Sequence, residues 1–197
     1  FLYSYFINFI PNILMMVVEQ VRLESNNNSR INPQLFSLWM GMASIVMLFG
    51  ALTSAYIVKQ GAGNWLDFKV PSVFYISTAI IISSSVSLHL ARNAYRAGKE
   101  HNFKFLVLTT LVLGLAFLVC QYFGWMSLFN SGVELTTNPA GSFFYLITWM
   151  HAAHIVGGVG ALLATTINAY TLKFKVTELR KNRVEMVLHY WHFIDVL

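Results

Sequence analysis

Four long apolar stretches dominate this sequence and limit what it can fold into. They cover about residues 35–58, 72–91, 104–129 and 141–172. Roughly 20 apolar residues are enough to cross a bilayer as a helix. A fifth apolar stretch runs from near Val184 to Leu197, and its roughly 14 residues span about 21 Å, short of the roughly 30 Å of hydrocarbon. We therefore expect an all-α, polytopic membrane helix bundle with five transmembrane helices. We also expect a native chain that continues past Leu197, truncated here at its C-terminus, which an intact-mass measurement would test.

The composition supports a membrane protein. The chain is 56% hydrophobic and only 11% charged, which is unlike an ordinary soluble domain. Its net charge of +5 arises from short basic runs between apolar stretches, and membrane topology and anionic lipid explain such runs better than nucleic acid does. The single cysteine, Cys120, excludes an internal disulfide and multi-cysteine metal clusters. The sequence contains no P-loop, GxSxG, HExxH or dinucleotide motif, which argues against hydrolytic or nucleotide-driven chemistry.

Lysine and arginine are distributed unequally between the connections. Eleven of them fall on one side of the expected bundle: Arg22, Arg30, Arg92, Arg96, Lys99, Lys104, Lys173, Lys175, Arg180, Lys181 and Arg183. Only Lys59 and Lys69 remain for the other side. Because cytoplasmic loops of membrane proteins are enriched in basic residues, we expect loops 92–104 and 173–183 to be cytoplasmic.

The first 20 residues, FLYSYFINFIPNILMMVVEQ, are long enough for another span but are interrupted by Asn8, Pro11 and Asn12. A kinked transmembrane helix and an interfacial helix are both physically acceptable, and we favour an extra N-terminal transmembrane helix. We therefore divide the chain into residues 1–31, an apolar helix with a polar linker, and residues 32–197, the transmembrane domain.

Two histidine pairs are the candidate ligands in this sequence. His151 with His154, and His189 with His192, are spaced i, i+3, which puts each pair on one helix face. Ionisable side chains are expensive within a membrane and need a partner or a purpose. The rise per residue places His151 and His192 about 15 Å and 12 Å from opposite ends of their spans, so the two can meet near the midplane. This geometry allows a haem or metal site.

A structural role is the alternative, and we favour it. Asp195 follows His192 by three residues, so a hydrogen bond along one helix face would satisfy both side chains. The other histidine pair precedes GGVGALLA, a run of small residues that allows helices to approach closely. Glu185 lies near Arg183 and Lys181 in the sequence, where a solvated ion pair and contact with lipid headgroups both remain open.

Four motifs resemble subunit III of the haem–copper terminal oxidases. The C-terminal segment is similar to the signature E-x5-W-H-F-x-D-V at Glu185, Trp191, His192, Phe193, Asp195 and Val196. The fourth apolar stretch is similar to S-x-F…H-x-x-H-(V/I)-x-x-G at Ser142, Phe144, His151, His154, Ile155 and Gly158. The first stretch matches the family at Trp39, Ser44, Phe49 and Tyr56, and the third at Gln121 and Trp125. Together the motifs cover about residues 35–197, in the family's order and on its five-helix plan.

This resemblance implies a non-catalytic subunit III of a proton-pumping oxidase that reduces oxygen to water. It implies a chain without its own cofactor, with haem and copper in partner subunits, which stabilises subunit I and binds phospholipid in a cleft. The implied partners are oxidase subunits I and II and phospholipid, in a bacterial cytoplasmic (inner) membrane. Cytochrome c is favoured over quinol as the electron donor, and membership of a respiratory supercomplex stays open. The alternative is a membrane cytochrome or metalloprotein that uses the paired histidines as ligands.

The resemblance also gives the candidate site. We expect lipid-cleft or structural roles, and no catalytic or metal-binding role, for His151, His154, Arg183, Glu185, Trp191, His192 and Asp195. Two positions depart from the family pattern. Ile45 stands where the family usually has an acidic residue, and Gly124 stands where it has a glutamate. Roles of those carboxylates in proton collection or lipid contact are therefore not carried over to this chain.

Overall fold

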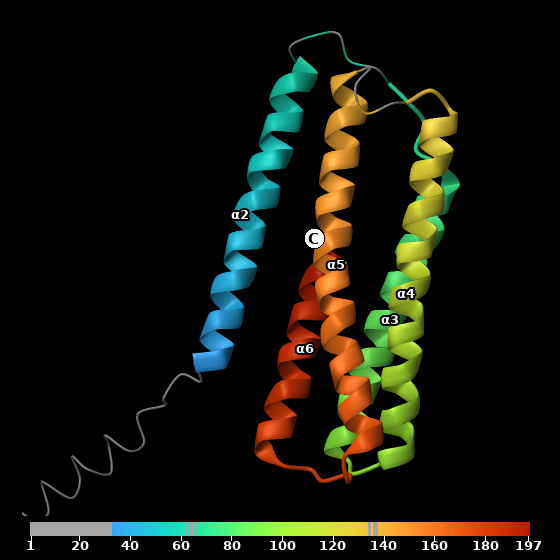
Figure 1. Cartoon of the computed structure of the whole chain (residues 1–197). Helices are drawn as coiled ribbons and strands as arrows, with labels where there is room; N and C mark the ends of the chain where they lie inside the picture. The colour runs from blue at the N-terminus through green and yellow to red at the C-terminus, as the bar shows by residue number, and fades with distance from the viewer. Residues whose placement is uncertain (1–32, 62, 64, 66, 134, 136–137) are drawn as a thin grey trace, which may run out of the picture. The chain divides into compact units, whose positions relative to one another are not determined.

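Five α-helices make up the part of the chain that the computed structural model describes, which is residues 33–61, 63, 65, 67–133, 135 and 138–197. They are α2 (Pro33–Gly61), α3 (Ser72–Arg96), α4 (Glu100–Asn130), α5 (Pro139–Thr171) and α6 (Glu178–Val196) (Figure 1). The helices α2 to α5 are long and apolar enough to cross a membrane. The expectation of an all-α bundle with several membrane spans is confirmed. The helix expected within residues 1–20 lies outside the described residues.

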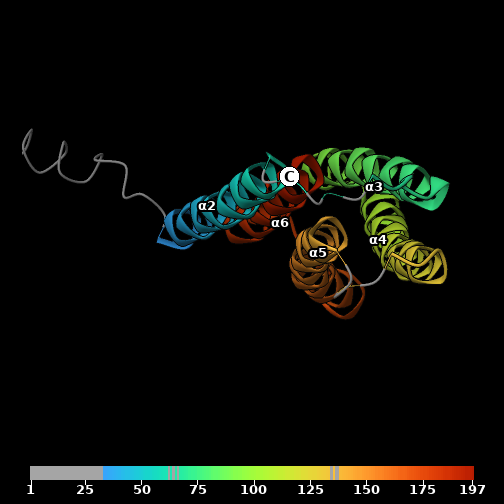
Figure 2. The same cartoon turned by 90° about the horizontal axis from the view of Figure 1, so that it is seen from above.

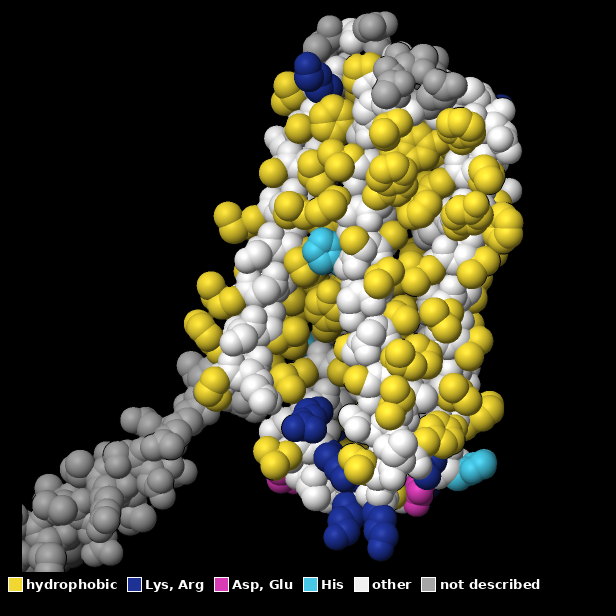
Figure 3. Space-filling model, in the orientation of Figure 1, with side chains coloured by type: hydrophobic (Ala, Val, Ile, Leu, Met, Phe, Trp, Pro, Cys, Tyr) yellow, Lys and Arg dark blue, Asp and Glu magenta, His cyan; other side chains and the backbone are white. Residues whose placement is uncertain are grey.

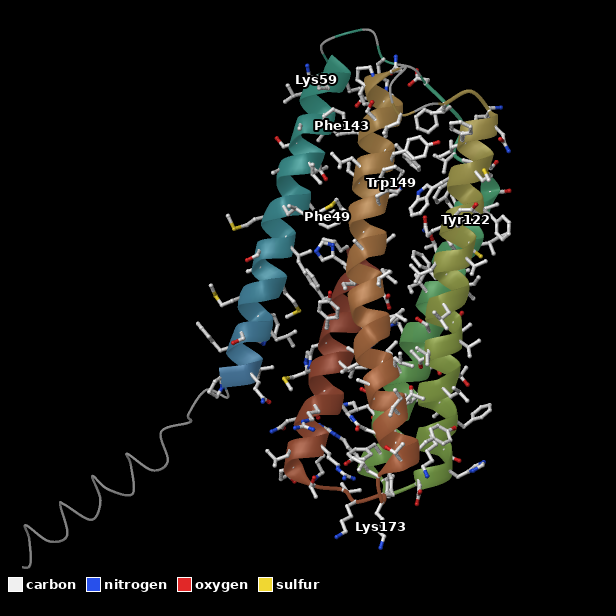
Figure 4. The ribbon with its side chains drawn as sticks, in the orientation of Figure 1. Phe49, Lys59, Tyr122, Phe143, Trp149 and Lys173 are labelled. Carbon is white, nitrogen blue, oxygen red and sulfur yellow. The ribbon has the colours of Figure 1, made fainter. Side chains whose placement is uncertain are left out.

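Residues Leu38–Leu197 form one compact unit, while Pro33–Ser37 at the start of α2 belong to the other. Within Leu38–Leu197, four helices form a closed ring: α3 and α5 each pack against both α4 and α6 (Figure 2). From Leu38 onward, α2 meets α5 and α6 through aromatic side chains, including Phe49, whose ring lies 5.7 Å from that of His154. Figure 4 shows Phe49 directed from α2 towards α5.

Short connections determine which helix ends lie together. Gly98, between α3 and α4, has φ +71°, a conformation that side chains with a Cβ rarely adopt. At the start of α5 the Asn138 side chain accepts a hydrogen bond from the backbone N–H of Ala140. Pro139 occupies the first helical turn, where its missing N–H costs nothing. These connections place the end of α3 and the start of α4 beside the end of α5 and the start of α6 (Figure 1).

The last helix begins earlier than its apolar pattern predicted. We expected the fifth stretch to begin near Val184, whereas α6 begins at Glu178. The extra turn and a half, ELRKNR, is polar except for the exposed Leu179, and most of its residues are good helix formers. It also carries an ion pair between Glu178 and Lys181, 2.8 Å apart. Hydropathy detects the apolar part of a helix and misses a solvated first turn.

Basic side chains gather at one end of the described structure. Arg92, Arg96, Lys99 and Lys104 surround the α3–α4 turn, and Lys173, Lys175, Arg180, Lys181 and Arg183 surround the α5–α6 connection. In Figure 3 the dark blue side chains cluster at the lower end, and hydrophobic side chains cover the middle of the visible face. Lys59 and Lys173, labelled in Figure 4, mark opposite ends. This is the arrangement of a membrane-spanning bundle whose two ends differ in charge.

Candidate functional site

Trp191 of α6 lies at the centre of the four-helix ring. Its side chain is 1% exposed, and its indole N–H donates to the Ser84 hydroxyl of α3 at 2.9 Å. Gly114 of α4 and Gly158 of α5 contact the ring: a Cβ added at either glycine would lie 2.9 Å from a Trp191 carbon. One signature residue therefore touches the other three helices of the ring. The lipid-cleft or structural role expected for Trp191 stays a prediction, which the variants proposed below test.

His192 and Asp195 are linked through a residue of another helix. We expected a direct hydrogen bond between them, but the Ser85 hydroxyl of α3 lies between the two. Ser85 donates to the Asp195 carboxylate, and its oxygen lies 2.8 Å from Nδ1 of His192. A hydroxyl has one proton, so the Nδ1–H of His192 must be the donor in the second bond. Asp195 Oδ1 is buried and has no hydrogen-bond partner among the described residues.

Glu185 pairs with arginines of α3. We expected Arg183 or Lys181 as its neighbours, but the Glu185 carboxylate accepts from Arg96 and lies 3.5 Å from Arg92. Lys181 pairs with Glu178 one turn away. The reason is helical geometry, because Arg183 is two residues from Glu185 and so points to a different face. The pair joins α3 to α6 at the basic end of the bundle.

The two histidine pairs have separate partners. In α5, His151 packs edge-on against Phe49 and Phe117, and Nδ1–H of His154 donates to the Met150 carbonyl at 2.6 Å. In α6, Nδ1–H of His189 donates to the Glu185 carbonyl at 2.7 Å. Within the described ranges, three or more His, Cys, Asp or Glu side chains do not come together in a way that would hold a metal ion.

Arg183 lines a cavity between α5 and α6 instead of joining the Glu185 cluster. The cavity measures about 300 Å³. Its lining comes from the ends of α3, α4 and α5, the α5–α6 connection and the start of α6, and includes Tyr95, Phe103, Ala161, Ala164, Thr165, Asn168, Ala169, Leu172, Phe174, Arg180, Arg183, Val184, Met186 and Val187. Most of these side chains are apolar, and Arg180 and Arg183 supply the positive charge. The expected lipid-cleft residues Arg183 and Glu185 of α6 therefore lie in different places, with Arg183 at this cavity and Glu185 against the arginines of α3.

Gly124, where the resemblance led us to expect a glutamate, lies against an aromatic ring. A Cβ at Gly124 of α4 would lie 2.7 Å from the ring of Phe74 in α3. Phe74 also packs edge-on against Phe144 of α5, with ring centroids 5.5 Å apart. The aromatic ring occupies the space that a larger side chain at position 124 would need. A glutamate side chain would not fit here without movement of Phe74.

Sequence reasoning missed the α3 side of this site. Ser84 bonds to Trp191, and Ser85 bonds to both His192 and Asp195. Two arginines of the same helix, Arg92 and Arg96, pair with Glu185. The available signal was the run SSSVS within an apolar span, since hydroxyl groups inside a membrane helix often bond to neighbouring helices. The run does not say which of its four serines face inward, because three of them are consecutive.

The fold and this site define an integral-membrane helix bundle whose C-terminal helix is held in place by hydrogen bonds and ion pairs to its neighbour. The family model described as "Cytochrome c oxidase subunit III" matches residues 61–197, and the chain belongs to that family. It is therefore a subunit of a haem–copper terminal oxidase complex, and the resemblance drawn from the four motifs is confirmed.

Similar proteins from several bacteria agree with this assignment. The "Probable cytochrome c oxidase subunit 3" of Nocardia farcinica is 28% identical over 170 residues, covering 81% of this chain and 79% of the relative. The "Cytochrome c oxidase subunit 3" of Corynebacterium diphtheriae is 30% identical over 160 residues, covering 77% of each. The "Probable quinol oxidase subunit 3" of Staphylococcus haemolyticus is 24% identical over 168 residues, covering 81% of each.

Proposed function

We propose that this subunit stabilises subunit I of its oxidase and binds phospholipid, and that the oxidase takes electrons from cytochrome c. The two bacterial relatives named as cytochrome c oxidase subunits are 28% and 30% identical to this chain, against 24% for the quinol oxidase relative. Haem and copper belong to the partner subunits in this proposal. The paired histidines agree with a structural role, because their rings bond to Ser85 and to the carbonyls of Met150 and Glu185, or pack against Phe49.

The cavity between α5 and α6 is the observation that carries the phospholipid proposal. Its walls are mainly apolar, which suits acyl chains, and it lies at the basic end of the bundle. Arg183 is exposed and makes no ion pair with any described residue. Arg180 donates to the Lys173 carbonyl at 2.8 Å, which leaves its positive charge without a carboxylate. Two such arginines beside an apolar cavity fit an anionic headgroup with its chains.

Lipid analysis of the intact oxidase tests this site. We expect Arg183→Gln to reduce the amount of one phospholipid class that co-purifies with the complex. Lys99→Gln is the matched control, because Lys99 is an exposed basic residue at the same end and does not line the cavity. A second variant, Glu185→Gln, tests whether the lipid headgroup lies beside the α3 arginines instead. Lipid lost with Glu185→Gln and retained with Arg183→Gln would place the headgroup near α3 and contradict the cavity as the site.

Spectroscopy tests the assignment of the redox centres. We expect the haem signal of a reduced-minus-oxidised spectrum to follow the partner subunits when this chain is stripped from the complex, and we expect the stripped chain to be colourless. We also expect oxidase lacking this subunit to lose activity faster during turnover, because subunit I is less stable alone. A haem signal that stays with this chain would show that its histidines are ligands.

A further inference from the structure

A network of three polar side chains joins α3 to α6. Its members are Ser85 of α3 and His192 and Asp195 of α6. The Ser85 hydroxyl contacts Oδ2 of Asp195, and its oxygen lies 2.8 Å from Nδ1 of His192. A hydroxyl can donate one hydrogen bond and accept another, and either nitrogen of a neutral imidazole can carry the proton. The same heavy-atom positions therefore allow two arrangements, which differ by one proton.

Asp195 is ionised in the first arrangement and neutral in the second. In the first, Nδ1–H of His192 donates to Ser85, and the Ser85 hydroxyl donates to the carboxylate. In the second, both bonds are reversed: the carboxyl O–H of Asp195 donates to Ser85, whose hydroxyl donates to Nδ1 of His192. The imidazole then carries its own proton on Nε2. The second arrangement holds one more proton and keeps both hydrogen bonds.

The surroundings of Asp195 favour the neutral acid. Its Oδ1 atom is buried and has no hydrogen-bond partner in the part of the chain that the structure describes. Asp195 lines a cavity of about 790 Å³, and the described residues that line it include His151 of α5 but no lysine or arginine. A buried carboxylate is costly where neither a donor nor a cation compensates its charge, and such a group tends to become neutral.

His192 connects the network to the surface. It lines a groove of about 290 Å³ with the exposed His89, and the two ring centroids lie 6.2 Å apart. It lines a second groove with the exposed His189. Its Nε2 atom makes no hydrogen bond to any described residue and can therefore bind a proton. Two turns away, Glu185 and Arg92 pair with each other across 3.5 Å. The described residues that α2 and α4 contribute to these cavities are not titratable.

We infer that Ser85, His192 and Asp195 form a proton-uptake network, which takes up one proton at Nε2 of His192 and holds it on the carboxyl group of Asp195. A proton from water binds Nε2, the proton on Nδ1 passes to the Ser85 oxygen, and the hydroxyl proton of Ser85 passes to Oδ2 of Asp195. No other bond forms or breaks, and nothing is oxidised or reduced. The inference does not rest on the proposed stabilisation of subunit I or on phospholipid binding, so it can fail while both of those hold.

Infrared spectra of the intact oxidase, recorded as the pH is lowered, test the proton on Asp195. We expect a carboxylic acid C=O band to grow, to shift when the aspartates are isotope-labelled, and to be lost in Asp195→Asn. Asp67→Asn is the matched control and should keep the band, because Asp67 is exposed in the connection between α2 and α3. The inference is overturned if no aspartate band grows, or if the band persists in Asp195→Asn.

Variants of Ser85 test the path of the proton. Uptake through Ser85 moves the imidazole proton of His192 from Nδ1 to Nε2, and the imidazole bands of histidine-labelled oxidase report this change. We expect Ser85→Ala to abolish the imidazole change, whereas Ser85→Thr keeps the hydroxyl and should keep both the imidazole change and the C=O band. Ser83→Ala should behave as wild type, because Ser83 is exposed and donates to the Ala79 carbonyl of its own helix at 2.8 Å. An imidazole change that is absent from the wild type, or that persists in Ser85→Ala, would overturn the inference.

Discussion

Trp191 of α6 donates its indole N–H to the Ser84 hydroxyl of α3 across 2.9 Å, and both side chains are almost completely buried. The Ser84 hydroxyl in turn donates to the Ile81 carbonyl at 2.7 Å. This hydrogen bond therefore ties the C-terminal signature to a helix about 100 residues earlier in the chain, at the centre of the ring formed by α3 to α6.

Removal of the acceptor is expected to destabilise the subunit. Ser84→Ala leaves the buried indole N–H of Trp191 unpaired, which should lower the free energy of unfolding by about 1–3 kcal/mol. Ser83→Ala is the matched control, because Ser83 is exposed and bonds only within its own helix, so its effect should stay within about 0.5 kcal/mol. Unfolding in denaturing detergent measures both. Similar values for the two variants would show that the Trp191 bond contributes little.

The close approach of α5 to Trp191 gives a steric prediction. Gly158→Ala places a Cβ 2.9 Å from the indole ring, and overpacking of this kind should cost about 1–3 kcal/mol of unfolding free energy. The control is Gly160→Ala in the same helix, where nothing lies within 4 Å of the added Cβ. Alanine is a better helix former there, so Gly160→Ala should be neutral or stabilising by up to about 1 kcal/mol. A neutral Gly158→Ala would mean that Trp191 can move aside.

The bridging role of Ser85 is testable by a double-mutant cycle. Ser85→Ala removes the acceptor of His192 and the donor to Asp195 together, so it should cost more than the same change at Ser83. We expect an interaction energy of about 0.5–3 kcal/mol between Ser85→Ala and His192→Phe, as for residues in one network. Additive effects on the unfolding free energy would contradict the bridge.

The ion pairs at the basic end should stabilise the bundle by different amounts. Glu185→Gln removes the carboxylate shared by Arg92 and Arg96, and we expect a loss of about 1 kcal/mol that shrinks at high salt, because the pair is partly exposed. Glu100→Gln breaks the i,i+4 pair with Lys104 on α4 and should cost only about 0.3–0.5 kcal/mol. Thermal unfolding of the complex at low and high ionic strength distinguishes them. If Glu185→Gln loses no more stability than Glu100→Gln, the ion pairs between α3 and α6 contribute no more than an ordinary surface ion pair.

The two ends of the bundle should face different compartments. In a Cys120→Ser background, we expect Lys99→Cys to react with an impermeant thiol reagent from the cytoplasmic side, because the basic loops 92–104 and 173–183 are predicted there. Asp67→Cys, in the exposed connection between α2 and α3, should react only from the other side. Labelling of right-side-out and inverted vesicles reads out both positions, and the opposite pattern would reverse the predicted topology.

The sequence alone determined the fold class, four of the spans and the family. Long apolar runs can only satisfy their backbone groups as helices in a membrane, so the number and order of α2 to α5 follow from hydropathy. The start of α6 at Glu178 does not follow, because a polar first turn has no apolar signal. The signature residues of α6 are recognisable from their spacing within one helix, which local geometry defines.

Only the tertiary structure decided which partners those residues have. The spacing of His192 and Asp195 suggested a direct bond, but Ser85 of α3 lies between them. Glu185 likewise pairs with Arg92 and Arg96 instead of its sequence neighbours. The physical reason is that periodicity along one helix defines its faces, and contacts between helices also depend on how those helices are rotated and shifted against each other. That arrangement comes from the packing of Trp191 against Gly114 and Gly158, which no single stretch of sequence contains.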